Sequence, residues 1–450
     1  MTIELPQKVR VILDRLRQGG YEGYAVGGCV RDALLGRIPH DWDITTSAKP
    51  LETKSLFERT IDTGIQHGTV TVMIDHEGFE VTTYRIDGEY EDSRHPKEVA
   101  FTANLIEDLK RRDFTINAMA YNETDGLVDE FDGVKDLQEK KIRCVGDPRE
   151  RFGEDALRIL RAVRFSAQLG FCVEEKTKEA VRELAPTLRA ISAERIQTEL
   201  VKLLLSPNPQ MMRDVAELGI TSVVMPEFDE ALERRRILSL KEGKALSDTE
   251  EKREDGRWFF NVACFCPPEK SIRLAAILWI LGENAEKSAQ RTLEVLRRLK
   301  FDNDTIEKTV TLVRFHDLRV EPEKTAIRKA IYEVGEERFP ALLMLWRAEL
   351  EAKESGKEFM AAGQSTGEKA VLCQESAQEK LRQIEKLYEE IIKDGDCLSL
   401  RMLAVTGRDL LDAGMKPGKE VGERLTKMLF DVLEHPEHNT KEYLLYSVFR

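Results

Sequence analysis

The stretch YAVGGCVRDALLGRIPHDWDI, at residues 24–44, decides the fold class of this 450-residue chain. Its first three residues suit a short β-strand, and Val30 to Leu35 suit a helix. Between them, Gly27 and Gly28 allow the backbone to turn tightly and to approach a ligand closely. Backbone N–H groups at such a turn and helix start can bind phosphate. The stretch therefore predicts a strand, a turn and a helix arranged to hold a phosphorylated ligand.

Two aspartates follow the predicted helix in the run Asp41-Trp42-Asp43-Ile44. Alternate residues of a strand face opposite sides, so Asp41 and Asp43 would share one face, with Cα atoms roughly 6.5–7 Å apart. Two carboxylates on one face can hold a pair of Mg²⁺ ions together with substrate phosphates. An isolated Asp-x-Asp is more often a polar strand face, but its place directly after the glycine turn favours a metal site. Glu80, on a later predicted strand, is either a third metal ligand or an ordinary polar-face residue.

Short β-branched runs separated by turn residues occupy the first part of the chain, at 69–74, 79–85 and 98–102. After about residue 146 the strand signal fades and helical periodicity takes over. Residues 233–257 are charged and have no clear period, which indicates a surface loop or an insertion between helical parts. The sequence therefore predicts an α+β head followed by an all-helical remainder.

The composition is that of an ordinary globular chain, with 41% hydrophobic and 34% charged residues. The longest apolar stretch, Leu274 to Leu281, is far shorter than the roughly 20 residues that span a bilayer, and it favours a buried helix. We see no secretory signal, and the seven scattered cysteines favour reduced thiols in the cytoplasm. The formal net charge of −13 argues weakly against a nucleic-acid partner, but a basic region lies between Arg111 and Arg164.

Six motifs, in the order that the family shows, make the chain resemble the class II tRNA nucleotidyltransferase and bacterial poly(A) polymerase family, most of all its bacterial CCA-adding enzymes. They are GGCVRD (27–32), DWD (41–43), RRDFTINAMAYN (111–122), VDEFDGVKDL (128–137), EDALRILRAVRF (154–165) and ISAERIQTEL (191–200). Residues 403–425 also look like the tail of that group. The resemblance implies a polymerase-β-like catalytic head (1–145), a helical neck for base recognition (146–225), a helical body (226–335) and a helical tail that binds tRNA (336–450).

The resemblance also implies an activity, in which CTP and ATP are used in turn, without a nucleic-acid template, to build CCA on the 3′ end of tRNA. Mg²⁺ is the implied cofactor, and tRNA, CTP and ATP are the implied partners. We expect no membrane association, and the sequence leaves open whether the chain forms a homodimer. The metal-binding catalytic pair falls on Asp41 and Asp43. The other implied site residues are Gly27, Gly28 and Arg31 for phosphate and sugar, Asp32 to support the turn, and Arg112, Asp113, Asn117, Asp155, Arg158, Arg161 and Arg164 for the nucleotide.

Asp113 and Asn117 are four residues apart and are expected to share one helical face. The resemblance places Asp113 near the ribose, where a carboxylate that accepts a hydrogen bond from the 2′-OH would distinguish ribonucleotides from deoxyribonucleotides. The alternative for Asp113 is a plain helix N-cap. Arg112 is either a contact for the triphosphate or a solvated cation.

Glu154, Asp155 and Arg158 are expected to open a helix, on which residues three and four apart face one side. The simple interpretation is a surface charge pair worth roughly 0.2–0.5 kcal/mol. Cytosine and adenine, however, both show an amino donor beside a ring-nitrogen acceptor, whereas guanine and uracil show the reverse order. An acceptor from Asp155 beside donors from Arg158 therefore fits C and A and opposes G and U. The family assigns this role to the matching motif, and Glu154 would hold Arg158 in place.

Other functions stay open beside CCA addition. The nearest are a poly(A) polymerase, against which the short, mixed C-terminal end argues, and a partial enzyme that adds only CC or only A, against which a full-length candidate loop at 85–99, with the part at 86–96, argues. We expect that loop to reshape the site between C and A. The intact acidic residues argue against a non-catalytic RNA-binding protein. His316-Asp317 alone, without partner histidines, is a poor signal for a metal phosphohydrolase.

Overall fold

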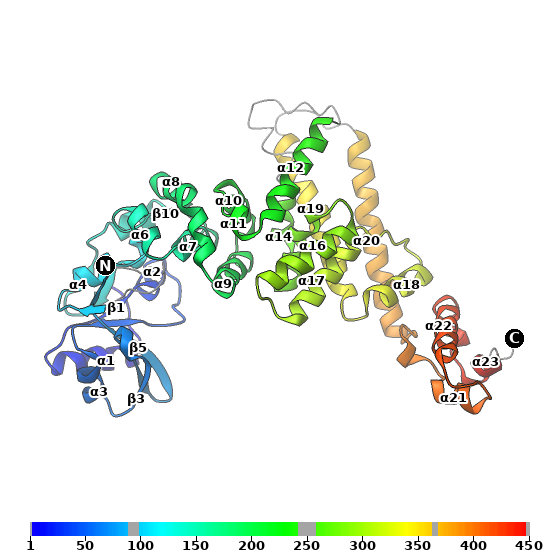
Figure 1. The fold of residues 1–450 in the computed structure, drawn as a ribbon, viewed down its shortest axis with the longest axis horizontal. Helices are drawn as coiled ribbons and strands as arrows, with labels where there is room; N and C mark the ends of the chain where they lie inside the picture. The colour runs from blue at the N-terminus through cyan, green and yellow to red at the C-terminus, as the bar shows by residue number, and fades with distance from the viewer. Residues whose placement is uncertain (1, 89–98, 242–257, 362–367, 447–450) are drawn as a thin grey trace. The chain divides into compact units, whose positions relative to one another are not determined.

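The computed structural model of the chain describes residues 2–88, 99–241, 258–361 and 368–446, which form two compact units that divide between Pro226 and Glu227 (Figure 1). The expected gating loop lies outside the described residues from 89 onward, and so does the charged segment from 242 to 257. The expected α+β head followed by helices is confirmed. The finer division into head, neck, body and tail stays a prediction.

A mixed sheet forms the centre of the first unit. Within the described residues it has seven strands in the order β3-β4-β5-β2-β1-β8-β9, of which β2 and β5 run parallel and the other neighbours antiparallel. These strands are β1 (Gly23–Val26), β2 (Ile44–Thr46), β3 (Thr60–Gly64), β4 (Thr69–Ile74), β5 (Glu77–Thr83), β8 (Ala120–Asn122) and β9 (Gly126–Val128).

Alternating burial explains the strands that the sequence predicted. Val70 and Val72 of β4 are buried, and so are Phe79 and Val81 of β5, so one face of this hairpin packs into the core. The run expected at 79–85 is not one strand. After β5 the buried Tyr84 intervenes, and the chain leaves the large sheet to form β6 (Arg85–Asp87), which pairs with β7 (Val99–Phe101).

Helices surround this sheet and continue the first unit beyond it (Figure 1). Helix α1 packs on β1 through Val9, Ile12 and Leu16, which recur at helical spacing and are fully buried. The helices are α1 (Gln7–Gln18), α2 (Gly28–Leu34), α3 (Pro50–Leu56), α4 (Leu105–Lys110), α5 (Gly133–Gln138), α6 (Pro148–Glu154), α7 (Leu157–Leu169), α8 (Glu175–Leu184), α9 (Ala193–Leu204), α10 (Met212–Glu217) and α11 (Thr221–Val224). A further small sheet joins β10 (Lys141–Ile142) to β11 (Cys172–Val173).

The second unit is helical throughout its described residues. Its helices are α12 (Pro226–Lys241, whose first residue belongs to the first unit), α14 (Trp258–Phe265), α15 (Lys270–Leu278), α16 (Ala285–Arg298), α17 (Asn303–Phe315), α18 (Lys324–Val334), α19 (Phe339–Ala361), α20 (Glu368–Asp394), α21 (Gly407–Asp412), α22 (Lys419–Glu434) and α23 (Lys441–Tyr446). The loop expected from 233 is therefore wrong up to residue 241, because α12 continues through it. The apolar stretch at 274–281 is the buried helical segment that was expected.

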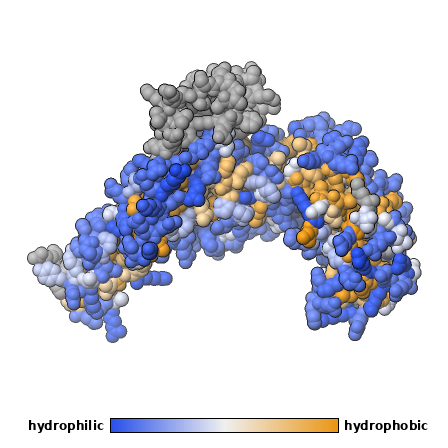
Figure 2. Space-filling view, turned by 180° about the vertical axis from the view of Figure 1, so that it is seen from behind, coloured by the Kyte–Doolittle hydropathy of each residue, from blue (hydrophilic) through white to orange (hydrophobic). Residues whose placement is uncertain are grey.

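Hydrophilic residues cover most of the face shown in Figure 2. Among the described residues, no helix combines the length and the apolar character that a membrane crossing needs.

Candidate active site

Asp41 and Asp43 lie in the extended segment directly before β2, which begins at Ile44. The expectation that they are strand residues is wrong by this short margin, although the backbone N–H of Val26 still donates to the carbonyl of Asp43 (3.0 Å). The expected alternation of faces does occur, since both aspartates are exposed, Trp42 is half-buried and Ile44 is buried. Both carboxylates therefore point away from the core at the end of a central strand.

Glu80 comes close to this pair through the pairing of neighbouring strands. Ile44 pairs with Val81 in the parallel ladder between β2 and β5, so Asp43 and Glu80 precede paired residues and share the exposed face. Burial beneath surrounding atoms raises the pKa of Asp43, the charges of Glu80 and Asp41 raise it further, and the guanidinium of Arg112 opposes the increase. The three carboxylates thus repel one another.

These carboxylates suit a divalent metal by their chemistry. None of the three makes a hydrogen bond or ion pair with another described side chain, so their charge is left without a bonded partner inside the described structure. Their ligand atoms do not all lie within 4.8 Å of one another. Hard divalent cations accept a few carboxylates and complete their coordination with water and substrate phosphates, which fits this open arrangement better than a closed cage would.

The turn between β1 and α2 lies beside Arg112. Gly27 has φ +80°, a left-handed conformation that glycine adopts without strain, and a Cβ at this position would lie 3.0 Å from Nη1 of Arg112. Arg112 is anchored to Asp108 (3.4 Å), and its buried Nε finds no hydrogen-bond partner among the described residues. A cation therefore lies between the glycine turn and the carboxylates.

Asp108 organises this cation, although the sequence analysis did not single it out. Its side chain is fully buried, and it accepts hydrogen bonds from Thr45 (3.1 Å) and from Arg111 (2.7 Å) as well as from Arg112. Its spacing three and four residues before Arg111 and Arg112, which directly follow α4, was the available signal. Burial raises the pKa of Asp108, but the charges of Arg112 and Arg111 lower it more.

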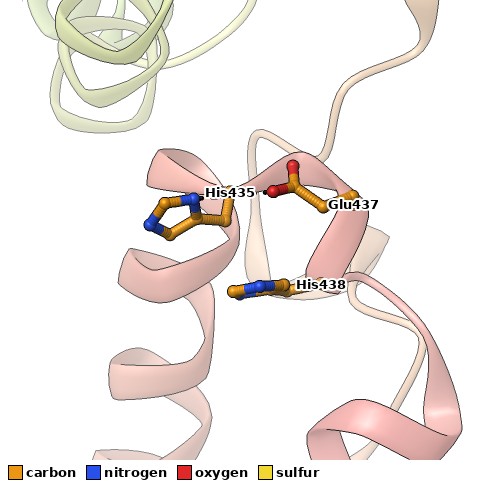
Figure 3. Close-up of side chains that lie close together, drawn as sticks. All are labelled: His435, Glu437 and His438. Carbon is orange, nitrogen blue, oxygen red and sulfur yellow. Dashed lines mark ion pairs between the residues drawn. The ribbon is translucent and has the colours of Figure 1, made fainter.

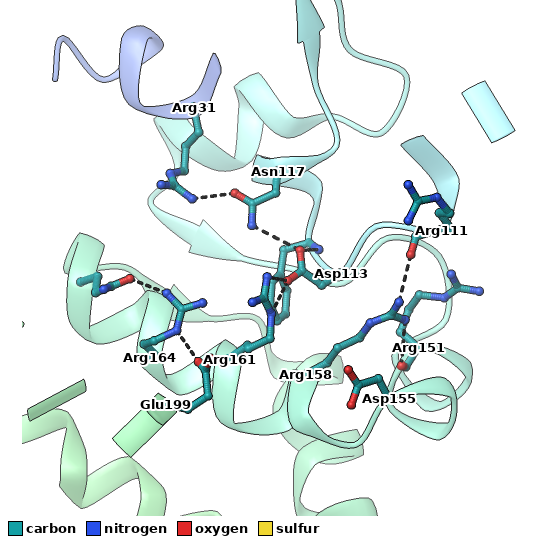
Figure 4. A network of polar contacts seen from close by, with 12 residues as sticks. Arg31, Arg111, Asp113, Asn117, Arg151, Asp155, Arg158, Arg161, Arg164 and Glu199 are labelled. Atoms are coloured by element: carbon teal, nitrogen blue, oxygen red, sulfur yellow. Dashed lines mark hydrogen bonds and ion pairs between the residues drawn. The ribbon is translucent and has the colours of Figure 1, made fainter. Parts of the chain in front are cut away.

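A second network connects α2 to α7 (Figure 4). Arg31 is buried, pairs with the adjacent Asp32 (2.9 Å) and donates to Oδ1 of Asn117 (2.6 Å). Asn117 in turn donates to Asp113 (3.2 Å), and Arg161 of α7 donates to the other oxygen of Asp113 (2.8 and 2.5 Å). The expectation that Asp113 and Asn117 share one helical face is wrong, because Asn117 lies on the 3₁₀ helix Thr115–Asn117 and Asp113 precedes that helix, although the two side chains do meet.

The carboxylate of Asp113 is fully used by protein donors. One oxygen accepts from the N–H of Phe114 (2.8 Å) and from Asn117, and the other accepts twice from Arg161. A carboxylate offers about four acceptor positions, so none is left over. Burial raises the pKa of Asp113, but Arg161 and, more weakly, Arg158 and Asn117 lower it to about 2. Asp113 is not a plain N-cap, because Phe114 occupies that position of the 3₁₀ helix.

The expected single helix at 154–158 is wrong. Glu154 ends α6, Asp155 leaves the helical conformation at φ −138° and ψ 103°, and α7 begins at Leu157. The N–H of Arg158 still donates to the carbonyl of Asp155 (3.0 Å), so both residues belong to one turn. At this break the side chain of Asp155 accepts from the N–H of Leu157 (3.0 Å), the first residue of α7.

Asp155 and Arg158, the two residues expected to read the base, have different partners. Glu154 forms an ion pair with Arg158, whose other donors reach the carbonyls of Arg151 (3.0 Å) and Arg111 (3.1 Å). Asp155 instead pairs with Arg195 of α9 (2.7 Å), a residue that the sequence analysis quoted within a motif without assigning it a role. The second nitrogen of Arg195, Nη1, is buried and has no partner among the described residues.

Arg164 lies deeper than a ligand contact requires. Its guanidinium is buried, pairs with Glu199 of α9 and lies 3.9 Å from the ring centroid of Phe165. Arg31 and Arg161 approach the same ring (5.3 Å each), so this aromatic side chain is enclosed by three cations. Arg164 therefore packs inside the protein, and its expected contact with the nucleotide stays a prediction.

Comparison with known proteins agrees with this arrangement. Three family models match: the poly A polymerase head domain at residues 23–143, the RNA and SrmB-binding site of polymerase A at 170–232, and the tRNA nucleotidyltransferase domain 2 at 269–448. The chain is 34% identical to the CCA-adding enzyme of Levilactobacillus brevis, over 98% of this chain and 97% of that enzyme. It is 36% identical to the CCA-adding enzyme of Enterococcus faecalis, over 96% and 93% of the two chains.

A solved structure resembles the whole chain. The CCA-adding enzyme of Bacillus stearothermophilus in complex with CTP superimposes with a TM-score of 0.71 at 29% identity, over 98% of this chain and 96% of that one.

Proposed function

Because this chain belongs to the family of CCA-adding enzymes, which are tRNA nucleotidyltransferases, we propose that it extends the 3′ end of tRNA with C, C and A from CTP and ATP. The proposal rests on the presence of two groups of residues in one compact unit. One group is the carboxylates Asp41, Asp43 and Glu80, which have no bonded partner among the described residues, and the other is the turn with Asp155 and Arg158. The relative of similar structure was solved with CTP. The three carboxylates suit nucleotidyl transfer, and the turn with Asp155 and Arg158 suits the choice of base.

The family depends on a divalent metal, and we propose Mg²⁺, held by Asp41 and Asp43 with Glu80 as a further ligand. Such ions, when bound, activate the attacking 3′-OH and stabilise the leaving pyrophosphate. Glu80 would contribute even without binding an ion directly, because its negative charge already raises the pKa of Asp43. Arg112, which opposes that increase, lies on the side where the triphosphate would bring further negative charge.

The triphosphate would bind at the glycine turn. The N–H of Gly27 already donates to the carbonyl of Met119 (3.1 Å), so the N–H groups that follow it, beginning with Gly28, form the cradle. Arg112 supplies the charge beside this turn. Arg31 acts through its neighbours, since its guanidinium holds both Asp32 and Asn117.

Asp113 would select the ribose only by exchanging a partner. All of its acceptor positions are used, so a hydrogen bond from a 2′-OH must replace one from Phe114, Asn117 or Arg161. Asn117 is the easiest partner to exchange, because its hydrogen bond is the longest (3.2 Å) and its donor is a neutral side chain. Arg161 then remains to keep Asp113 ionised.

Base choice would rest on Asp155 and Arg158. Asp155 accepts the amino group that C and A share, while Arg195 holds its other oxygen. Arg158 donates to the ring nitrogen after it turns away from one of its carbonyl partners, and Glu154 keeps it near. Uracil and guanine would oppose an acceptor with an acceptor, and a matched pair of contacts discriminates by roughly 1–3 kcal/mol.

The test is an assay with tRNA that lacks its 3′ end, Mg²⁺ and each labelled nucleotide alone or combined, followed by sequencing of the product. Wild type should add CCA and stop. Asp41→Ala and Asp43→Ala should lose several orders of magnitude in rate and keep tRNA binding. Asp14→Ala, an exposed aspartate of α1 in the same unit, is the matched control. Near-normal turnover in either site variant would exclude the two-aspartate mechanism.

The same assay distinguishes the neighbouring activities. A long A tract from ATP alone would identify a poly(A) polymerase, and arrest after CC, or addition of A only to tRNA that ends in CC, would identify a partial enzyme. A cytoplasmic location belongs to the proposal, since tRNA is the substrate and none of the six described cysteines forms a disulfide. Sedimentation of the purified chain would decide between a monomer and a homodimer.

A further inference from the structure

Two histidines and a glutamate gather near the C-terminal end of the second unit (Figure 3). His435 follows α22, and Glu437 and His438 belong to the 3₁₀ helix η7 (Pro436–His438). One ligand atom from each residue lies within 4.8 Å of the others. Within the described ranges this is the one group of three or more such side chains that comes so close together.

A neighbouring carboxylate orients one of the histidines. Nδ1 of His438 lies 3.0 Å from Oδ2 of Asp431 in the last turns of α22, an arrangement that protonates Nδ1 and leaves Nε2 as the lone-pair donor. The His438 ring also stacks on Tyr443 of α23, with centroids 3.9 Å apart and an angle of 20° between the rings. The imidazole is therefore held from two sides in a fixed orientation.

The backbone beneath the cluster is also fixed. The N–H of His438 donates to the carbonyl of His435 (2.9 Å), which closes the turn that brings both rings together. The next residue, Asn439, accepts from the N–H of Ala404 (2.8 Å) and donates to the carbonyl of Met402 (3.0 Å). The cluster thus lies where α22, η7 and the segment before α21 are tied to one another.

We propose that His435, Glu437 and His438 form a binding site for a divalent transition-metal ion of the zinc class. Imidazole nitrogens favour such ions, whereas Mg²⁺ prefers oxygen ligands only, so this site is chemically distinct from the carboxylates of the first unit. Two histidines and one glutamate form a known three-ligand set for zinc that leaves a fourth position for water or another ligand.

The observed spacing is compatible with such an ion. Zinc lies about 2.0–2.1 Å from nitrogen and oxygen ligands, which in tetrahedral geometry places the ligand atoms about 3.3–3.4 Å apart. Ligand atoms that now lie within 4.8 Å must approach by little more than an ångström, and His435 and Glu437 are exposed and can rotate. The ion would join the end of α22 to η7 and stabilise the last helices against unfolding.

The experiment measures Zn²⁺ binding to the full-length chain, stripped of metal, in competition with a chromophoric chelator. Millimolar Mg²⁺ is present to saturate the oxygen-ligand site. We expect one Zn²⁺ per chain, and Co²⁺ in its place should give a ligand-field spectrum in the visible range. The double variant His435→Ala/His438→Ala should lose both signals. Asp431→Asn should keep the site but weaken it by about 10–100-fold, as removal of a supporting carboxylate does.

Two matched variants guard against other sources of binding. His76→Asn replaces an exposed histidine of the first unit with a residue that tolerates its φ of +69°, and Cys264→Ser replaces an exposed thiol of the second unit. Both should bind Zn²⁺ as wild type does. The proposal is overturned if the double variant binds with wild-type affinity, if Mg²⁺ displaces the ion, or if the signal disappears in Cys264→Ser. Circular dichroism that matches wild type would show that the double variant is folded.

Discussion

At the scale of single residues, Asp113 connects the parts of the candidate site. Its carboxylate binds Asn117, which binds Arg31, and it also binds Arg161 on a different helix. If two ion pairs or hydrogen bonds were removed from this chain of contacts, buried polar groups would be left without partners. The resulting loss of folding free energy would exceed what the contacts themselves contribute. The geometry of this network therefore depends on the ionisation of one buried acid.

The pH dependence of stability should reveal that ionisation. Asp113 has a pKa of about 2 in the folded chain, below its ordinary value of 3.8, so its contribution is complete above about pH 4 and is lost as the pH falls toward 2. Asp113→Asn should lower the free energy of unfolding by on the order of 2 kcal/mol near neutral pH. The difference in unfolding free energy between variant and wild type should shrink below pH 4, as measured by urea unfolding that is followed through signals from the first unit. A difference that stays constant down to pH 3 would contradict it.

Arg195 provides a second prediction at this scale. Because it holds one oxygen of Asp155, Arg195→Ala should let that carboxylate rotate and should weaken discrimination against UTP and GTP, though less than Asp155→Ala or Arg158→Ala does. The measurement is kcat/KM for each nucleotide on tRNA that lacks its 3′ end. Arg195→Lys should restore part of the selectivity, and Arg182→Ala, an exposed arginine on α8, should leave it unchanged. Wild-type selectivity in Arg195→Ala would remove this positioning role.

At the scale of elements, the turn between β1 and α2 depends on the absence of a side chain. Gly27→Ala meets two costs, a backbone at φ +80° and ψ −127° that strains a residue with a Cβ by on the order of 1–3 kcal/mol, and a contact with Arg112 at 3.0 Å. Gly20→Ala is a matched control, since Gly20 has φ +84° and open space around its Cβ position. Both variants should lose stability, Gly27→Ala the more because it also meets Arg112, but only Gly27→Ala should raise KM for the nucleotide by displacing Arg112. Equal kinetic effects would show that Arg112 is not held by the turn.

The same elements show how far sequence predicts structure. Strand β4 was predicted at its observed bounds because alternation of apolar residues is a local property. The break at Asp155 was not, because its carboxylate contacts the first N–H of α7 and pairs with an arginine forty residues later, and the second contact exists only in the fold. Asp108 was missed for a related reason: its spacing before two arginines is ordinary on a surface helix, and only the fold buries it. Patterns within one element were predictable, whereas pairings between elements required the fold.

At the scale of the whole molecule, the acidic composition and a nucleic-acid substrate have to be reconciled. The chain carries a formal net charge of −13, so its long-range field alone would repel tRNA. Many arginines are also already paired with acids inside the structure, as Arg112 is with Asp108 and Arg161 with Asp113. Binding must therefore rely on exposed cations that contact phosphates at short range, where counterion release outweighs the unfavourable total charge.

Salt titration tests whether exposed cations hold the phosphates of tRNA. Each phosphate that Lys or Arg neutralises releases counterions, so the logarithm of the tRNA affinity should fall linearly with the logarithm of the salt concentration. With about six such contacts, the affinity should decrease by on the order of 10³ between 50 and 200 mM salt. Affinity should vary little among tRNAs of different sequence, because A-form helices are recognised mainly by shape and backbone. Asp41→Ala should leave the slope unchanged, since it removes no cation. Binding that is independent of salt would mean that tRNA is held by neutral contacts, and the acidic charge would then need no local compensation.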